Sequence, residues 1–349
     1  MNRDNHTVAS YWARIHLHNA VRQGANGTQI LTQAALPLEL VQEPKARISA
    51  QQLAAVVRAS WLAGNDELLG LTTGKIKVGV FALLAQRIIH CKTLLDVLRE
   101  AVTFYNLITD GVQFSFKVVA QEARFAITVN HLKDHENLDG SLGYSRSLII
   151  EFIFLVWHRF PSWLLGQVIP LKQINFEFSK PAHSDEYRLM FFCPCHFNNG
   201  KNELIFDKRF LSLPVIQSQA KLPDYLSTIP QQWFRKPAFY ESFTSVVLRF
   251  LEENVNLQHT SIESVAQELH MTSRTLRRKL QDEGSGFQSL KDQVRTDLAI
   301  HLLGEGTMPM AEVAQRIGFT EAAAFSRAFK QWTGMAPAKY RNVFHKSGK

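Results

Sequence analysis

The residues of this chain that could do nucleophilic or metal chemistry lie close together at Cys193, Cys195 and His196. A thiolate beside an imidazole can attack an electrophile, and both groups are ligands that zinc prefers. A closed zinc site takes four such ligands, and the chain has only one further cysteine, Cys91. We therefore favour the other interpretation, a turn with half-buried thiols and no chemical role.

Two further polar features could bind a ligand. His131, Asp134, His135 and Glu136 follow a predicted strand and could hold a metal, but such clusters are usually solvated loops. Arg146 begins a predicted helix and could face an anionic effector, although exposed arginines are common. The sequence shows no phosphate-binding glycine loop and no nucleophile–base pair. It therefore predicts no catalytic residue, no metal site and no cofactor.

The basic residues near the C-terminus have a chemistry of their own. Arg274, Arg277, Arg278 and Lys279 lie within eight residues of Thr272, with no acid among them. A guanidinium can pair with guanine O6 and N7 through two hydrogen bonds. The whole chain carries a formal net charge of +8, which favours a polyanionic partner.

An internal repeat positions these basic residues. The segment Val265-Ala266-Gln267 recurs as Val313-Ala314-Gln315, and one extra residue enters the second copy after Thr320. The matched pairs that follow are Leu269 with Ile317, Met271 with Phe319, Thr272 with Thr320, Leu276 with Phe325, and Leu280 with Phe329. Each copy predicts a helix, a tight turn and a second helix.

Turn and cap residues fit this interpretation. His270 and Gly318 fall at the two turns, where a left-handed residue is needed. Three residues are predicted to cap helices: Thr260, with capping-box spacing to Glu263, and Thr272 and Thr320 before the second helices. A plain helical bundle with solvated basic faces is the alternative, but matched caps, turns and basic faces favour two helix-turn-helix units.

The C-terminal region resembles the AraC/XylS family of regulators. The resemblance covers residues 245–343 and is carried by Gly318-Phe319-Thr320, Ala324 to Lys330, Gly334 to Pro337, and Tyr340-Arg341. It implies that Ser289 to Leu303 forms the long helix joining the two units. The apolar side chains expected on its inner face are Leu290, Val294, Leu298 and Leu302.

The same resemblance implies which residues contact DNA. Base-facing positions are Arg274, Arg277 and Arg278 in the first unit, and Ala322, Ala323, Ser326 and Arg327 in the second. The full predicted contact set adds Thr272, Ser273, Thr320 and Lys330. Alanine can touch a thymine methyl but makes no hydrogen bond, so the second unit is expected to discriminate bases less sharply.

The N-terminal part predicts an α+β domain. Helix is expected over most of residues 1–70, after Thr93 and over 144–160, and strands over 112–118, 125–129, 203–206 and from Ile174 to Phe178, before Pro181. Gly70-Leu71, Thr93-Leu94, Phe206-Asp207 and Leu211 to Pro214 resemble the sensor domain of arabinose- and ornithine-responsive regulators. We carry over the sensor role and no ligand residues. The aromatic stripe Phe152, Phe154, Trp157 and Phe160 could line a pocket or pack in the core.

The predicted organisation is therefore an α+β sensor over residues 1–215, a linker over 216–243, and an all-α DNA-binding domain over 244–345 with two helix-turn-helix units joined by a long helix. Pro214, Pro223, Pro230 and Pro237 punctuate the linker region. Residues 1–12 lack a signal peptide's apolar run, and Leu148 to Trp157 is too short to span a bilayer. A cytoplasmic location without membrane contact is expected.

The predicted function is an effector-controlled transcription regulator, an activator that binds double-stranded DNA and RNA polymerase. A homodimer is left open, as is a first domain that only dimerises. The rival class is an enzyme, because Pro194-Cys195-His196 resembles the core of alkyl-acceptor DNA repair proteins. Those proteins have arginine where Phe197 stands, four zinc-binding cysteines, and an acceptor domain after the DNA-binding region.

Overall fold

The chain folds into two compact units, each assembled from separate stretches of sequence. The computed structural model describes residues 6–72, 74–130, 143–234, 242–254, 257–306 and 308–346. One unit contains residues 16–27 and 57–239, and the other contains 1–15, 28–56 and 240–349. This grouping follows contacts rather than chain order. The predicted domain boundaries near residues 215 and 244 stay a prediction.

A five-stranded sheet organises the first unit, which we call the sensor unit. Its strand order is β3 (Val112–Val119), β4 (Glu122–Val129), β7 (Asn202–Asp207), β5 (Leu171–Asn175) and β6 (Cys195–His196). All neighbours are antiparallel except β5 and β6. The turn between β3 and β4 is shorter than expected, because only Ala120 and Gln121 lie outside the strands, with Ala120 at φ 53°.

The expected strand over Ile174 to Phe178 is wrong at its end, since β5 stops at Asn175. Beyond this point the Glu177 N–H donates to the Asn202 side chain at 2.9 Å instead of continuing the strand pairing. The Phe176 ring stacks on Phe197 at 5.5 Å and lies 4.8 Å from Phe178. The alternation of Phe176 and Phe178 therefore reflects their packing in an aromatic cluster and not a longer strand.

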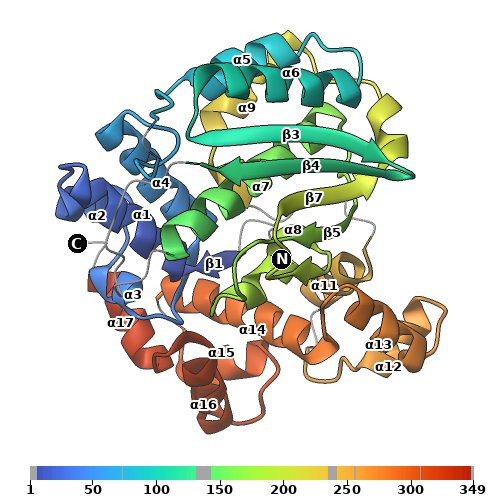
Figure 1. Cartoon of the computed structure of the whole chain (residues 1–349). Helices are drawn as coiled ribbons and strands as arrows, with labels where there is room; N and C mark the ends of the chain where they lie inside the picture. Colours follow the sequence, from blue (N-terminus) through green and yellow to red (C-terminus); the bar gives the residue numbers. More distant parts are fainter. Residues whose placement is uncertain are drawn as a thin grey trace. The chain divides into compact units, whose positions relative to one another are not determined.

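Helix α7 (Gly143–Leu164) covers one face of this sheet (Figure 1). Its Trp157 ring lies 5.5 Å from Phe125 on β4 and 6.3 Å from Phe114 on β3. The helix continues beyond residue 160, where it was expected to end, and includes His158 and Arg159. Both side chains are buried, and the Arg159 guanidinium donates to the Met190 carbonyl at 2.7 Å.

Short elements complete the sensor unit. Helices α5 (Val80–Ile88) and α6 (Leu94–Ile108) pack beside each other near β3, and Thr93 caps α6 in a capping box with Asp96 (Figure 1). The remaining elements are η2 (Ser184–Glu186), α8 (Tyr187–Phe191), η3 (Lys208–Ser212), η4 (Gln219–Lys221), α9 (Leu222–Thr228) and α10 (Gln231–Phe234). The proline-punctuated segment therefore holds only short helices as far as it is described, as expected.

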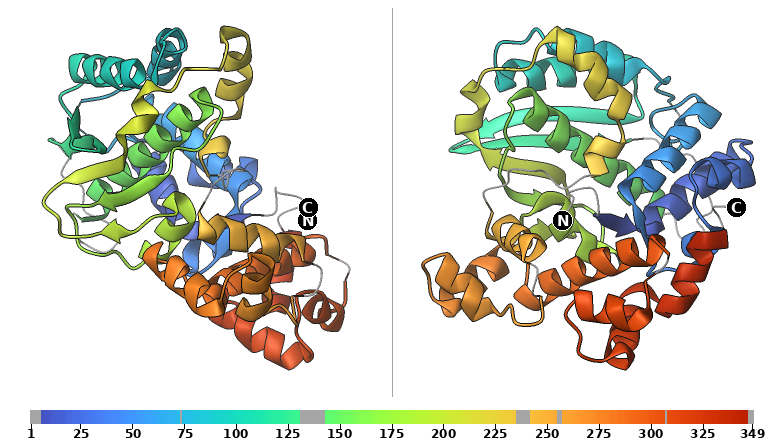
Figure 2. Two further views of the ribbon diagram at one scale, coloured as in Figure 1. Left: turned by 90° about the vertical axis from the view of Figure 1, so that its right-hand side faces the viewer. Right: turned by 180° about the vertical axis from the view of Figure 1, so that it is seen from behind.

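The second unit, which we call the DNA unit after its predicted role, is mainly helical. Its C-terminal helices are α11 (Phe243–Glu253), α12 (Ile262–Glu268), α13 (Ser273–Asp282), α14 (Phe287–Gly304), α15 (Met310–Arg316), α16 (Ala322–Thr333) and α17 (Pro337–Lys346). Figure 2 shows the α12–α13 and α15–α16 pairs at opposite ends of α14. The predicted joining helix is confirmed, with Leu290, Val294 and Leu302 buried.

The N-terminal segment is mostly helical, as expected, but it also contains strands that the sequence pattern did not indicate. Besides α1 (Ser10–Arg22), α2 (Gly27–Gln33), α3 (Leu38–Gln42) and α4 (Ala50–Gly64), it forms two strands, β1 (Thr7–Ala9) and β2 (Arg47–Ser49). They pair antiparallel, with Val8 opposite Ile48. Three-residue strands are too short to show a period, which is why the sequence pattern did not indicate them. Within the described residues, the structure has no helix both long and apolar enough for a membrane span.

Candidate DNA-binding face and effector pocket

The first helix-turn-helix pair is α12 and α13, held by a small buried core. Val265, Ala266, Leu276 and Leu280 are all buried. His270 adopts the left-handed conformation at the turn, with φ 52°. Thus the predicted helix-turn-helix arrangement is confirmed in the first copy.

The caps of this pair are partly as predicted. Thr272 caps α13, and its hydroxyl accepts the Thr275 N–H at 3.2 Å. Thr260 does not cap α12. Ser261 takes that position in a capping box with Ser264, while the buried Thr260 offers its carbonyl to the Lys291 ammonium at 2.7 Å.

Three arginines form the exposed basic face of α13. Arg274, Arg277 and Arg278 are exposed, and their spacing by three and four residues sets them on one side of the helix. None of them forms an ion pair within the described part of the chain. Lys279 is different, because its ammonium lies 4.1 Å from the centre of the Phe243 ring and contributes to packing.

The second pair, α15 and α16, repeats the geometry with a tighter turn. Gly318 has φ 85°, and a Cβ there would lie 2.6 Å from the Gln258 backbone nitrogen. Both the left-handed conformation and the close backbone contact therefore require glycine. Phe325 and Phe329 are fully buried as predicted. The Arg295 guanidinium of α14 donates to the Gly318 carbonyl at 3.1 Å, which ties the joining helix to this turn.

Thr320 does not cap α16. The residue at the cap position is Glu321, which makes no side-chain cap bond. The extra residue of the second repeat falls here, so the hydroxyl is displaced from the cap position. On the helix, Ala323, Arg327 and Lys330 are exposed, whereas Ala322 and Ser326 are half-buried. The Ser326 hydroxyl donates to the Ala322 carbonyl at 2.9 Å.

The sensor unit contains a pocket of about 500 Å³, counting the space at its mouth. It is lined almost entirely by apolar and aromatic side chains from α4, the loop after it, α5, α6, β3, α7 and the segment after α9. These are Trp61, Glu67, Leu68, Ile76, Phe81, Tyr105, Phe114, Phe152, Ile153, Val156, Trp157, Ile229 and Trp233. Of the predicted aromatic stripe, Phe152 and Trp157 line the pocket, and Phe154 and Phe160 pack in the core.

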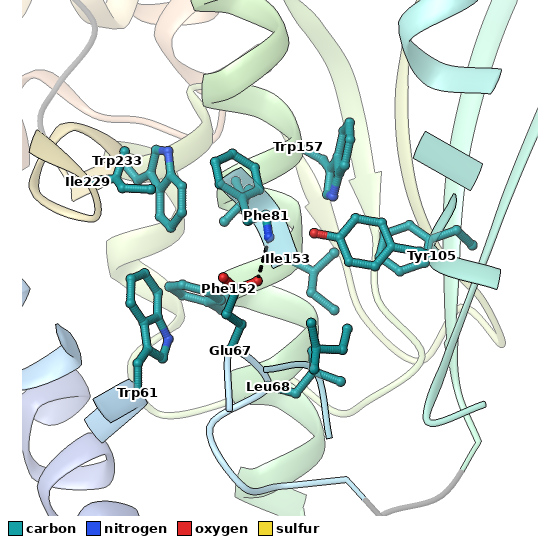
Figure 3. Close-up of a pocket in the computed structure, with 13 residues that line it drawn as sticks. Trp61, Glu67, Leu68, Phe81, Tyr105, Phe152, Ile153, Trp157, Ile229 and Trp233 are labelled. Carbon is teal, nitrogen blue, oxygen red and sulfur yellow. Dashed lines mark hydrogen bonds between the residues drawn. The ribbon is translucent and has the colours of Figure 1, made fainter. Parts of the chain in front are cut away.

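The polar groups of the pocket are few. The Glu67 carboxylate accepts the Gly79 N–H at 2.8 Å and the Phe81 N–H at 2.9 Å. Figure 3 shows this carboxylate and the Tyr105 hydroxyl directed into the same space. Burial raises the pKa of Glu67 to about 7, with a smaller contribution from Asp66, against the effect of the two N–H groups. The Trp61 indole N–H is buried without a hydrogen-bond partner among the described atoms.

A neighbouring carboxylate fixes the loop that carries Glu67. Asp66 is fully buried and accepts the N–H groups of Leu68, Gly70 and Ile76 at 2.9 to 3.0 Å. The Glu67 N–H in turn donates to the Ile76 carbonyl at 2.7 Å. Sequence reasoning missed Glu67, because a single acid in a loop gives no sign that its side chain is partly buried.

The other candidate residues are placed away from this pocket. Arg146 donates to the Glu177 carboxylate at 2.7 Å and to the Val129 carbonyl, so it does not line the pocket. Cys193 and Cys195 form no disulfide, and the described residues contain no group of three or more metal-ligating side chains. The cluster from His131 to Glu136 lies outside the described residues.

The sequence matches known protein families in both of its parts. Residues 24–215 match the arabinose-binding N-terminal domain of AraC transcription regulators, and residues 265–342 match a helix-turn-helix domain. The chain is 22% identical to the ornithine utilization regulator of Pseudomonas aeruginosa over 95% of both chains. It is also 38% identical to the regulator VqsM of the same organism, over 25% of this chain and 27% of that one. The crystal structure of the regulator CdpR, also from that organism, aligns over 76% of this chain and 82% of its own, with 22% identity and a TM-score of 0.31.

Proposed function

The chain belongs to the AraC family of transcription regulators, and from this premise we propose that α13 reads the DNA sequence and that the aromatic pocket binds the effector. The protein is a DNA-binding transcription regulator with a ligand-binding N-terminal domain. The observation that carries the proposal for DNA is the exposed face of Arg274, Arg277 and Arg278. In the major groove, such a face can form paired hydrogen bonds to guanine.

We assign the second unit a weaker part in sequence recognition. On α16, Arg327 and Lys330 are the exposed cations and are suited to phosphate contacts. Ala322 and Ala323 offer only methyl groups, and Ser326 uses its hydroxyl proton on the helix backbone. The shorter side chains Thr272, Ser273 and Thr320 complete the proposed contact set at the helix starts.

The pocket supports the effector half of the proposal. It is the kind of largely apolar cavity with a few polar groups that binds small molecules. Activation through RNA polymerase and formation of a homodimer are parts of the proposal taken from the family. A cytoplasmic location is also proposed, since DNA is the ligand and the three cysteines form no disulfide. We propose no catalytic role, since the relatives that match along most of the chain are named as regulators.

The test uses the full chain and selection from randomised DNA. A variant with alanine at 274, 277 and 278 should lose sequence preference but keep salt-dependent, nonspecific binding. Arg209→Ala, an exposed arginine of the sensor unit, is the matched control. Retention of the full base preference by the triple variant would remove α13 from its proposed role. For the effector, any pocket ligand should change DNA affinity, and DNA should change ligand affinity by the same factor.

A further inference from the structure

The chemistry of the pocket walls restricts what the effector can be. This step rests on the proposed effector role of the pocket. Among its lining residues, Glu67 is the only side chain that carries a charge near neutral pH, and there is no lysine, arginine or histidine. An anion would enter without a counter-charge and would meet the Glu67 carboxylate. An amino acid would bring a carboxylate with its ammonium and face the same cost.

A sugar fits the walls no better. Its many hydroxyl groups would need hydrogen-bond partners once removed from water, because unpaired buried polar groups are costly. The pocket offers the Glu67 carboxylate, the Tyr105 hydroxyl and indole N–H groups, surrounded by apolar side chains. The family's arabinose label is therefore a poor guide to this chain's ligand.

The aromatic rings are arranged around the one carboxylate. The Trp233 ring lies 5.3 Å from Phe81, 5.7 Å from Phe152 and 6.0 Å from Trp61, all nearer to edge-on than parallel. Figure 3 shows the Glu67 carboxylate bonded to the Phe81 backbone and directed into the space that these rings line. Aromatic faces and a carboxylate both attract positive charge, and cages of this type hold quaternary ammonium groups.

We propose that the pocket binds an organic cation, an ammonium group carrying apolar substituents, with Glu67 as its counter-charge. Each Glu67 oxygen uses one lone pair on a backbone N–H of the Gly79–Phe81 segment, and the remaining lone pairs are available to the ligand. The aromatic rings bind the substituents. Capping of α5 accounts for the two backbone contacts, but it does not account for the space enclosed by rings beside them.

Ionisation of Glu67 gives the inference a pH signature. The groups that face it are the Gly79 and Phe81 N–H groups, the Tyr105 hydroxyl and Asp66. With a pKa of about 7, the carboxyl is only partly ionised in the empty pocket at neutral pH. A permanently charged ligand binds the ionised form, so its affinity should rise as the pH is raised through about 7 and then level off. An uncharged ligand of the same shape should show no such rise.

The experiment compares choline with neohexanol, its uncharged carbon isostere, and with the anion tert-butylacetate. Benzyltrimethylammonium and neopentylbenzene form a second, larger pair. Binding to the full-length protein is measured by calorimetry and by tryptophan fluorescence. At least one cation should bind roughly tenfold more tightly than its isostere, and the anion should not bind. Equal binding by the isostere, preference for the anion, or no binding by either cation would overturn the inference.

Variants locate the site. Glu67→Gln should abolish the preference for the cation and the pH-dependent rise, with its fold checked by the unfolding midpoint. Trp233→Phe keeps an aromatic ring but weakens its interaction with a cation, and should reduce cation affinity several-fold. Trp163→Phe is the matched control, because Trp163 stacks on Tyr225 outside the lining. If Glu67→Gln does not fold, the comparison of Trp233→Phe with Trp163→Phe and the pH dependence of cation affinity still test the inference.

The two proposals fail in different ways. Cations that bind the pocket without changing DNA affinity would remove the effector role and leave the cation inference standing. A neutral isostere that binds as tightly as the cation and changes DNA affinity would overturn the cation inference and leave the effector role standing.

Discussion

Arg277 is the residue at which the DNA-reading role of α13 is most directly tested. Its side chain is exposed in the middle of the helix, flanked by Arg274 and Arg278. We expect Arg277→Ala to cost about 1–3 kcal/mol of specific DNA binding and to relax base preference at one position. Selection from randomised sites measures both effects.

Arg327 and Ala322 on α16 provide the comparison. Arg327→Ala should weaken binding evenly across sequences and lower the salt slope by about one, as expected for a phosphate contact. Ala322→Gly should add only a helix-propensity cost of roughly 1 kcal/mol. Loss of base preference in the Arg327 variant, with full preference kept in the Arg277 variant, would reverse the assigned roles.

His158 ties the stability of the sensor unit to pH. Burial and the adjacent Arg159 lower its pKa from 6.5 to about 3, because the ring fits only as a neutral group. Its Nε2 lies 2.9 Å from the Ile169 carbonyl and its Nδ1 3.3 Å from the Arg159 guanidinium, so Nε2 donates and Nδ1 accepts. The unfolded chain takes up a proton below pH 6.5 and the folded chain does not. Stability should therefore be full above about pH 6.5 and fall as the pH drops toward 3.

Substitution separates this effect from general acid unfolding. His158→Gln keeps an amide donor for Ile169 and cannot be protonated. Between about pH 6.5 and about pH 4 its unfolding free energy should therefore fall by less than that of the wild type, and the difference should reach up to roughly 3 kcal/mol. His16 has a similarly lowered pKa of about 3, so part of the slope will remain. His90→Gln, at an exposed position, is the control for the substitution itself. Parallel curves for wild type and His158→Gln would contradict the assignment.

At the scale of elements, the two recognition helices begin differently. Thr272 caps α13 through the Thr275 N–H, whereas Thr320 lies one residue before Glu321, which occupies the cap position of α16. Thr272→Ala should lower the unfolding free energy by about 1 kcal/mol, and Thr320→Ala should leave it nearly unchanged. Urea unfolding of the full chain, followed by far-ultraviolet circular dichroism, measures the unfolding free energy of both variants. Equal losses would show that Thr320 stabilises its helix by some other contact.

The same elements show what sequence patterns can and cannot predict. Periodic segments predicted α6, α13 and the β3–β4 hairpin, because one buried face repeats along each of them, and the family resemblance predicted α14. Thr320 was wrongly predicted to cap α16, because an inserted residue shifts the cap position without disturbing the periodicity of the apolar residues. Three-residue strands and one-turn helices carry too few residues to show a period.

The two candidate sites differ in the same way. Arg274, Arg277 and Arg278 were predictable, because consecutive turns of one helix bring them together. The pocket was not, since Trp61, Glu67 and Trp233 meet only through tertiary folding. Phe152 and Trp157 were visible as an aromatic stripe, but nothing in the pattern separated them from the core residues Phe154 and Phe160.

At the scale of the whole molecule, the DNA unit includes the start of the chain. Asp297 on α14 is buried, and its Oδ1 accepts the Thr7 N–H at 3.2 Å, the Thr7 hydroxyl, and the Gln293 amide at 2.8 Å. The Tyr340 hydroxyl of α17 donates to the Arg47 carbonyl. Strands β1 and β2 therefore supply hydrogen bonds to the joining helix and to α17. A fragment of residues 240–349 would lack Thr7 and Arg47, and we expect it to be less stable than the intact unit.

Thr7 is the smallest change that tests this dependence. Its hydroxyl donates to Asp297 and accepts from the Arg47 Nε at 2.8 Å, so Thr7→Val removes the partner of two buried charged groups and keeps the shape. Leaving such groups short of partners should lower the unfolding free energy by about 2–4 kcal/mol. Thr103→Val is the control, because the Thr103 hydroxyl is exposed and bonds only within its own helix turn. Urea unfolding is followed by circular dichroism and by the loss of DNA binding. If Thr7→Val unfolds at the wild-type midpoint by both signals, the Thr7 hydroxyl bonds to Asp297 and Arg47 do not contribute to the stability of the DNA unit.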